Sequence, residues 1–273
     1  MEKIKIDDNL FSHGLYSTDI QTSKYIDWDR SIIVGNENIA VYTDQSLNRV
    51  NRGVKNKIAW LLESPSVTNY AHNWMKDNHH LFDVVFTNNK ELLDIGNKFK
   101  FVPTGGCWIK PQDQLIYQKS KMLSMITSIK NFTNGHNLRH LVMNNIKNID
   151  FYGRGINPID YKLHGLKDYM FSIVIENTKK DYYFTEKLID CFVTGTIPIY
   201  WGCPSIGKYF DDRGILIFDN IEDLNKIVSG ISEELYNLKL EYVRKNFNLS
   251  KEYLIAEDYM YEKYLKKYNS LTE

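Results

Sequence analysis

The hydrophobic pattern of the first hundred residues alternates between short strand-like runs and longer intervening segments. The run Ile58–Leu62 is continuously apolar, which is typical of a strand that is covered on both faces. Turn-forming residues bound the other runs, and two of the segments between them have the length of helices. We therefore predict strands at Ser31–Gly35, Ile39–Thr43, Lys57–Leu62, Val84–Thr87 and Phe99–Pro103, and helices at Tyr70–Leu81 and Asn89–Ile95.

The clearest unit of the second half is a strand–helix–strand segment. Thr185 is placed to cap its helix and Gly195 to end it, and the apolar residues between them fall on one helical face. A strand, a helix and a second strand in this order form a βαβ crossover, which indicates a parallel sheet. The predicted strands are Phe171–Ile175 and Thr196–Tyr200, and the predicted helix is Thr185–Thr194.

The other patterns of the second half complete a second α/β domain. We predict strands at Met122–Ser128 and Ile149–Tyr152, a helix at Asn137–Ile146, and helices from Asp219 onward, the last one capped by Ser250 and ending near Tyr268. The glycine-rich stretch at 105–111 breaks any regular pattern, which favours a domain joint nearby. We expect two Rossmann-like α/β domains, residues 1–112 and 113–273, with a cleft between them and the last helix packed back on the first domain.

Composition narrows the classes of function. Lys and Arg number 34 and Asp and Glu number 34, so the formal charge is zero and a broad electrostatic surface for nucleic acid or an anionic membrane is not expected. The three cysteines form no Cys-x-x-Cys pair, which favours reduced thiols. The N-terminus has no apolar core of signal-peptide length, and no apolar run reaches the length of a membrane span. These features favour a cytoplasmic protein.

The sharpest candidate for chemistry is the segment 176–187, ENTKKDYYFTEK, at the end of a predicted strand and the start of a helix. Ligands of open α/β sheets bind at such strand ends. Lys187 falls in the first helical turn, where a cation is unfavourable unless an anion is bound nearby or the side chain extends into solvent. The chain has neither a P-loop nor a Gly-x-Gly-x-x-Gly motif, which argues against a P-loop nucleotidase and a nicotinamide-type Rossmann site.

Residues 171–202, FSIVIENTKKDYYFTEKLIDCFVTGTIPIYWG, resemble the donor-binding motif of glycosyltransferase family 10, the α1,3/α1,4-fucosyltransferases. The family pattern is a Phe-Glu-Asn-like strand end, a short loop, Tyr-x-Thr-Glu-Lys opening a helix, and a strand that contains proline. The segments 149–155 and 124–139 also resemble family segments that lie upstream of the motif. The resemblance is strong over residues 120–218 and faint over the N-terminal half. It implies a GT-B-type fold whose C-terminal domain holds the nucleotide-sugar.

The resemblance also implies roles for individual residues. Arg139 and Lys187 are expected to contact the GDP phosphates, where fixed cations stabilise a departing diphosphate. Tyr183 and Glu186 are expected to hold the nucleoside, with Glu186 on the ribose. The Glu176–Asn177 pair is expected to line the fucose side of the pocket. From the residues alone, a solvated helix residue is the preferred interpretation of Arg139.

The family inverts the configuration of the sugar in one displacement, so a carboxylate must take the proton of the acceptor hydroxyl. The resemblance places this base in the N-terminal domain, near a Glu-Ser-Pro-like segment, and here Glu63 precedes Ser64-Pro65. The family segment can carry two glutamates where this chain has one. A second alignment therefore places Glu63 on the non-catalytic glutamate. A strand-end carboxylate paired with Lys57 is the structural alternative.

We expect no metal ion and no cofactor apart from the donor substrate. The acidic pairs Asp27/Asp29 and Asp211/Asp212 lie outside the βαβ segment and read as solvated loops, and His136 and His140 lack a third ligand. The leading hypothesis is an inverting, metal-independent fucosyltransferase that uses GDP-fucose and a glycan acceptor. The alternatives are the same fold with another nucleotide-sugar, and a catalytically inactive binding module.

The acceptor is expected to meet the N-terminal domain, where a polar-aromatic stretch follows Pro65. Tyr70, His72, Trp74 and His79 lie in this stretch, although such a sequence also suits ordinary helix packing. A cytoplasmic enzyme of this family suits a bacterial or viral pathway that modifies a surface polysaccharide or another glycan precursor.

Overall fold

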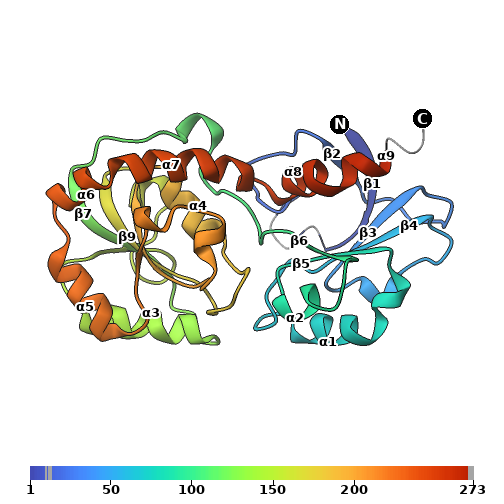
Figure 1. Cartoon of the computed structure of the whole chain (residues 1–273), viewed down its shortest axis with the longest axis horizontal. Coiled ribbons are helices and arrows are strands. Elements are labelled where there is room, and N and C mark those ends of the chain that lie inside the picture. The colour runs from blue at the N-terminus through green and yellow to red at the C-terminus, as the bar shows by residue number, and fades with distance from the viewer. Residues whose placement is uncertain (10, 12–13, 270–273) are drawn as a thin grey trace. The chain divides into compact units, whose positions relative to one another are not determined.

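The computed structural model describes residues 1–9, 11 and 14–269, and these residues form two α/β units (Figure 1). The N-terminal unit comprises the described residues of Met1–Gly106, Asp181–Tyr183 and Ile255–Glu273, and the C-terminal unit comprises Cys107–Lys180 and Phe184–Leu254. The first joint therefore follows Gly106, whereas the sequence predicts it after residue 112. The chain segment that begins at Ile255 belongs to the N-terminal unit.

A six-stranded parallel sheet forms the centre of the N-terminal unit. Its strand order is β2-β1-β3-β4-β5-β6. Every residue of β3 is buried, which explains its continuous apolar run. The strands are β1 (Glu2–Asp7), β2 (Ile26–Asp29), β3 (Ile39–Thr43), β4 (Asn56–Trp60), β5 (Val84–Thr87) and β6 (Phe99–Phe101).

Two apolar clusters cover the two faces of this sheet. Successive residues of a strand point to opposite faces, so Val41 belongs to one cluster and Tyr42 to the other. The cluster of Val41 includes Met260 and Leu265, and the cluster of Tyr42 includes residues of α1 and α2. The helices of this unit are α1 (Asn69–Asn78), α2 (Lys90–Leu93), α8 (Ala256–Met260) and α9 (Lys266–Asn269), with a π-helical turn at Tyr261–Leu265 between the last two.

Two expectations for the N-terminal half are wrong, and two strands were not predicted. Ser31–Gly35 is not a strand: Ile32 and Val34 are 83% and 69% exposed, so the apolar character of this loop does not come from burial. The strands β1 and β2 are not among the predicted elements. Asp27 and Asp29 lie in β2 and not in a loop, and the Asp29 carboxylate pairs with Lys5 of β1 at 3.2 Å.

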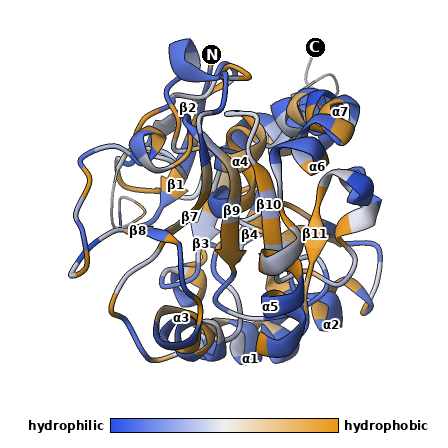
Figure 2. Cartoon of the chain, turned by 90° about the vertical axis from the view of Figure 1, so that its left-hand side faces the viewer, coloured by the Kyte–Doolittle hydropathy of each residue, from blue (hydrophilic) through white to orange (hydrophobic). Residues whose placement is uncertain are grey.

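The C-terminal unit contains a five-stranded parallel sheet of order β11-β10-β9-β7-β8. The helices α4 and α7 lie on one side of it and α3 and α5 on the other (Figures 1 and 2). The strands are β7 (Lys121–Ile126), β8 (Asp150–Tyr152), β9 (Tyr169–Ile175), β10 (Ile197–Trp201) and β11 (Leu216–Ile217). The helices are α3 (Asn134–Asn145), α4 (Glu186–Phe192), α5 (Ile221–Gly230), α6 (Glu233–Leu238) and α7 (Leu240–Ser250).

The predicted βαβ crossover is confirmed as β9–α4–β10. All seven residues of β9 are buried, and Figure 2 shows β9 and β10 as hydrophobic strands at the centre of the sheet. The Thr185 hydroxyl accepts a hydrogen bond from the Lys187 amide, which confirms Thr185 as the N-cap of α4. Gly195 ends the helical segment with φ at 72°, a conformation that favours glycine.

The expected role of Ser250 is wrong. Ser250 is the last residue of α7, and a short 3₁₀ turn at Lys251–Tyr253 follows it. The last α-helical segments begin at Ala256, where the chain enters the N-terminal unit. Among the residues that the structure describes, no helix has both the length and the apolar character needed to cross a bilayer.

Candidate functional site

The strand order of the C-terminal sheet creates a topological switch point between β7 and β9. From β7 the chain moves outward through α3 to β8, and it then returns to β9 on the other side of β7. The two crossovers thus run in opposite directions, and a crevice opens at the carboxyl ends of β7 and β9. Ligands of open α/β sheets bind at this position.

A cavity of about 170 Å³ lies at this switch point. Residues from the ends of β7 and β9, from α3 and from α4 line it, so elements that are distant in sequence meet there. Its polar lining consists mainly of Thr127, Ser128, Arg139, Lys162, Glu186, Lys187 and Asp190. Three cations thus face two carboxylates. The hydroxyl oxygen of Thr127 is buried and has no hydrogen-bond partner in the structure.

His136 is kept neutral by burial and by the positive charges near this cavity. His136 lies in the first turn of α3, with its Nδ1 2.7 Å from the Thr133 hydroxyl. Burial, together with the nearby charges of Arg139, Lys130 and Lys187, lowers the pKa of His136 to about 4. The same positive potential favours an anion in the cavity.

A partly buried ion-pair network connects Lys162 to the first two turns of α4. The Lys162 ammonium lies 2.9 Å from the Asp190 carboxylate and 3.4 Å from that of Glu186. Burial raises the pKa of Glu186, but Lys187 and Lys162 outweigh it and hold the pKa well below its usual range. Burial raises the pKa of Asp190, and Lys162 opposes this rise. Glu186 is therefore a carboxylate at neutral pH, fixed beside two ammonium groups.

Lys162 and Asp190 are absent from the sequence-based site. Lys162 lies in a short 3₁₀ helix before β9, in a segment without a recognisable motif. Asp190 did leave a signal, because it interrupts the apolar run of α4 one turn after Glu186. A carboxylate on the buried face of a helix requires a cationic partner. That partner comes from a distant part of the sequence.

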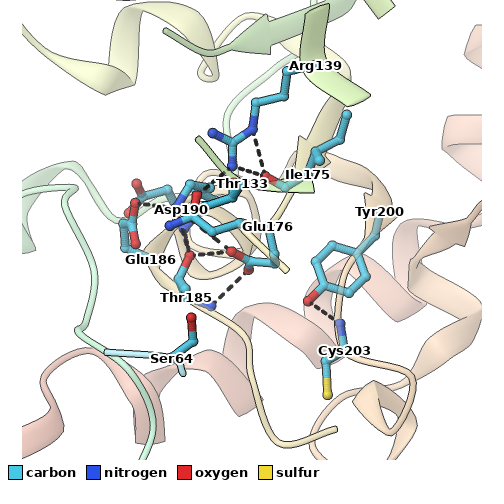
Figure 3. Close-up of polar contacts among 12 residues, drawn as sticks. Ser64, Thr133, Arg139, Ile175, Glu176, Thr185, Glu186, Asp190, Tyr200 and Cys203 are labelled. Atoms are coloured by element: carbon cyan, nitrogen blue, oxygen red, sulfur yellow. Dashed lines mark hydrogen bonds and ion pairs between the residues drawn. The ribbon is translucent and has the colours of Figure 1, made fainter. Parts of the chain in front are cut away.

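Glu176 supports the loop before α4. Its side chain is fully buried, and its carboxylate accepts hydrogen bonds from the Thr185 amide at 2.9 Å and the Thr185 hydroxyl at 2.7 Å (Figure 3). Lys187 Nζ lies 3.8 Å from the same carboxylate. Burial raises the pKa of Glu176, and the Lys187 charge opposes this rise. Glu176 is not among the residues that line the cavity.

Arg139 connects α3 to the end of β9. Its Nε donates to the Ile175 carbonyl at 3.1 Å (Figure 3). Its Nη2 donates to the Asn177 side-chain oxygen, also at 3.1 Å. Arg139 is 5% exposed and lines the cavity. Asn177 thus positions Arg139 and does not itself line the cavity.

Gly135 allows the close approach of α3 to β9. A Cβ atom at this position would lie 1.8 Å from the Glu176 carbonyl oxygen, so only glycine fits. The Gly135 amide also donates to the Asn177 carbonyl at 3.1 Å. Because Arg139 follows one turn later on α3, this contact sets the position of its guanidinium.

The remaining predicted residues lie in the N-terminal unit. Tyr183 is 1% exposed and belongs to the short segment Asp181–Tyr183 that clusters with that unit. Glu63 follows β4, with a partly exposed side chain. The Leu62 amide donates to the Asp44 carboxylate at 3.1 Å, and His72 Nε2 lies 2.9 Å from the Glu63 carbonyl oxygen. Lys57 pairs with Asp83 and not with Glu63.

His72 is buried on α1 and supports the backbone at Glu63, whereas Tyr70 is 55% exposed. The Asp211 carboxylate caps a 3₁₀ turn and pairs with Arg213 and Lys245, so it too is engaged in structure. Within residues 1–9, 11 and 14–269, no three His, Cys, Asp or Glu side chains gather to form a metal site.

The residues that line the cationic cavity fall within a region of the chain that matches a known family. Residues 116–212 match the model of glycosyltransferase family 10 (fucosyltransferase), C-terminal region. An alpha-(1,3)-fucosyltransferase of Helicobacter pylori is 32% identical over 128 residues, which are 47% of this chain and 23% of that relative. Alpha-(1,3)-fucosyltransferase B of Drosophila melanogaster is 36% identical over 83 residues, which are 28% of this chain and 18% of that relative. The resemblance to family 10 is therefore confirmed. The match spans under a quarter of the length of either relative.

Solved structures support the fold. A crystal structure of an alpha1,3-fucosyltransferase with GDP-fucose has a TM-score of 0.58 and 19% identity, covering 99% of this chain and 90% of the other. An alpha-glucosyltransferase in complex with UDP-glucose and DNA has a TM-score of 0.60 and 10% identity, covering 98% of both chains. At these identities the likeness establishes the fold alone, which is the predicted α/β fold of the GT-B type.

Proposed function

Because residues 116–212 match glycosyltransferase family 10, we propose that this protein transfers fucose from GDP-fucose to a hydroxyl group of a saccharide. The observation that carries the proposal is the cationic cavity at the switch point between β7 and β9. The curated relatives bear fucosyltransferase names, which favours GDP-fucose over other nucleotide-sugars.

The cavity suits the diphosphate of the donor. Its volume of about 170 Å³ is below the roughly 300–1,000 Å³ of complete small-molecule sites, and so corresponds to one polar part of a ligand. Arg139 supplies a planar guanidinium, and Lys187 and Lys162 supply point charges. As the bond between fucose and the phosphate oxygen breaks, negative charge accumulates on GDP. These cations stabilise that charge in a partly buried site.

Glu63 is the proposed general base. The acceptor oxygen attacks the anomeric carbon of fucose from the face opposite GDP, forming the new glycosidic bond with inversion. The acceptor proton passes to the Glu63 carboxylate. Because fixed cations compensate the leaving group, the proposed reaction requires no metal ion. The buried supports of the Glu63 backbone, Asp44 and His72, suit a residue that must be held in one orientation.

Calorimetry with GDP tests donor binding, and a Lys187→Met variant tests the cavity. We expect binding to the wild type and a loss of about tenfold or more in affinity for the variant, since one charge-assisted contact is worth roughly 1.5–3 kcal/mol. Lys180→Met is the matched control, because Lys180 is exposed in the preceding loop and does not line the cavity. Equal GDP affinities of both variants would refute the assigned site.

Release of GDP from GDP-fucose tests turnover and separates the alternatives. Binding of GDP without release, with or without saccharide acceptors, indicates a binding module. Release from UDP-glucose alone indicates another donor. For fucosyl transfer we expect Glu63→Gln to lower turnover by about 10²–10⁴-fold while GDP affinity is unchanged. Undiminished turnover of this variant would exclude Glu63 as the base, and undiminished turnover in EDTA is expected for the metal-independent reaction.

A further inference from the structure

The N-terminal sheet has a switch point of its own. The chain moves from β1 outward to β2 and then returns to β3 on the other side of β1. The carboxyl ends of β1 and β3 therefore border a crevice of the kind that binds ligands in open α/β sheets. In this position the N-terminal unit repeats the arrangement that forms the cationic cavity of the C-terminal unit.

A cavity of about 360 Å³ occupies this switch point. Its volume falls within the range of small-molecule sites. It is lined by residues at the carboxyl ends of β1 and β3 and in the segments that follow β1, β2 and β3, among them Asp7, Asp8, Arg30, Tyr42, Arg49 and Asn51. We refer to it as the β1/β3 cavity.

Two ion pairs preorganise the polar side of the β1/β3 cavity. Arg30 Nε and Nη2 each donate to the Asp8 carboxylate at 2.8 Å, in a bidentate pair. Arg30 Nη2 also donates to the Leu15 carbonyl at 2.8 Å, and the Asp8 side chain is only 1% exposed. Arg49 donates to the Asp7 carboxylate at 2.6 Å. The bidentate pair therefore fixes the plane of the Arg30 guanidinium before any ligand arrives.

The loops around the cavity are held by polar contacts. The hydroxyl of Tyr42, a residue of β3, accepts a hydrogen bond from the Asn51 amide at 3.0 Å. The Asn51 side chain donates to the Ile33 carbonyl at 3.4 Å. This contact joins the loop after β2 to the loop after β3. Ile33 and Tyr42 add apolar surface beside the charged groups.

The charges of the β1/β3 cavity balance, with two arginines and two aspartates among its lining residues. The lining of the cationic cavity, by contrast, has three cations and two carboxylates. The formal charge of the charged lining residues is therefore zero in the β1/β3 cavity, so its potential does not favour a phosphate or a sulfate. A neutral polyhydroxyl ligand keeps both pairs intact, because carboxylates accept its O–H groups, guanidinium groups donate to its oxygens, and apolar surface contacts its ring.

We propose that the β1/β3 cavity is a saccharide subsite that takes a neutral sugar unit of the acceptor. The proposal rests on the proposed transferase function. The neighbouring strand ends support it. Asp44 follows β3 directly, and its carboxylate binds the Leu62 amide just before Glu63. The candidate base and the β1/β3 cavity thus lie along the same edge of one sheet, because Glu63 follows β4, β4 pairs with β3, and β3 pairs with β1.

NMR of the arginine side chains tests this inference on the full chain with saturating GDP. The probes are lactose and N-acetyllactosamine as neutral saccharides, and a sulfated heparin disaccharide as the anionic one. At up to about 50 mM probe, far above the ~1 mM constant of a weak site, we expect the neutral saccharides to shift the Arg30 and Arg49 Nε resonances. No shift with either neutral probe, or shifts with the sulfated probe alone, would overturn the inference.

Variants locate the site. Asp8→Asn and Arg49→Met are each expected to raise the dissociation constant of the neutral probe at least about tenfold. Arg49→Met is expected to fold even if Asp8→Asn does not, since the Arg49 side chain is 53% exposed. Arg52→Met is the matched control, because Arg52 is exposed and does not line the cavity. Equal effects of all three variants refute the site. GDP affinity, measured in parallel, reports on the donor site: its absence refutes the proposed function, whereas normal GDP binding without saccharide binding refutes this inference alone.

Discussion

Replacing Gly135 by alanine sets two physical effects against each other. Gly135 is the second residue of α3, and alanine in a helix is more stable than glycine by up to about 1 kcal/mol. The added Cβ would, however, lie 1.8 Å from the Glu176 carbonyl oxygen and 2.8 Å from its carbon. Real Cβ contacts are essentially never shorter than 3.0 Å, so the helix or the end of β9 must move by at least 3.0 − 1.8 = 1.2 Å.

The steric effect is expected to dominate. Overpacking of a well-packed interior costs about 1–3 kcal/mol, and here the obstacle is backbone, which cannot rotate away. We expect Gly135→Ala to lower the free energy of unfolding by about 2 kcal/mol despite its better helix propensity. The functional effect is larger, because Arg139 moves with the helix. A displacement of about 1 Å in a binding group costs roughly 10²-fold.

Urea denaturation followed by circular dichroism measures the stability, and calorimetry measures GDP affinity. Gly230→Ala is the control, since Gly230 ends α5 and a Cβ atom there would meet nothing within 4 Å outside its own helix and chain neighbours. That variant is expected to be as stable as the wild type or slightly more stable, with unchanged GDP affinity. A Gly135→Ala protein with wild-type stability and GDP affinity would refute the packing argument.

Three further predictions concern stability, each measured by urea denaturation. Thr185→Ala removes the cap of α4 and a donor to buried Glu176, so it is expected to lower the free energy of unfolding by about 2–3 kcal/mol. Thr185→Ser keeps the hydroxyl and is expected to retain most of the wild-type stability. Lys162→Met leaves the Asp190 carboxylate buried without its cation and is expected to lower the free energy of unfolding by about 3–5 kcal/mol. A loss smaller than that of a surface lysine substitution would contradict the stabilising role of the Lys162–Asp190 ion pair. Burial raises the pKa of Asp44 from 3.8 to about 7, so its protonated form stabilises the folded state, fully below pH 3.8 and progressively less as the pH rises through about 7. At about 1.4 kcal/mol per pH unit the loss approaches about 4 kcal/mol, and it should be absent in Asp44→Asn.

Local patterns were sufficient for the centre of the C-terminal unit. The strand β9 is buried on both faces and therefore reads as an uninterrupted apolar run. Thr185 and Gly195 mark the helix ends because capping and positive φ are properties of single residues and their neighbours. The resemblance to family 10 depends on this contiguous segment and on the upstream segments 124–139 and 149–155. Arg139 and Lys187 could be assigned to one site only through this resemblance.

Patterns within a single segment were insufficient where distant parts of the chain decide whether a side chain is buried or which group it pairs with. Ile32 and Val34 are residues typical of a strand, but they lie exposed in a loop. Glu176 looks like a ligand-binding residue, yet its carboxylate holds the cap of α4. Lys162 carries no motif, and only the fold brings it to Asp190.

The amino-acid sequence alone determined the βαβ core, its helix caps and the family that its C-terminal region resembles, since each depends on residues that are neighbours along the chain. Tertiary structure decided which strands lie side by side and which cations pair with which carboxylates. Strand order sets both switch points, and it arises from the packing of distant segments, whose contacts no local pattern encodes.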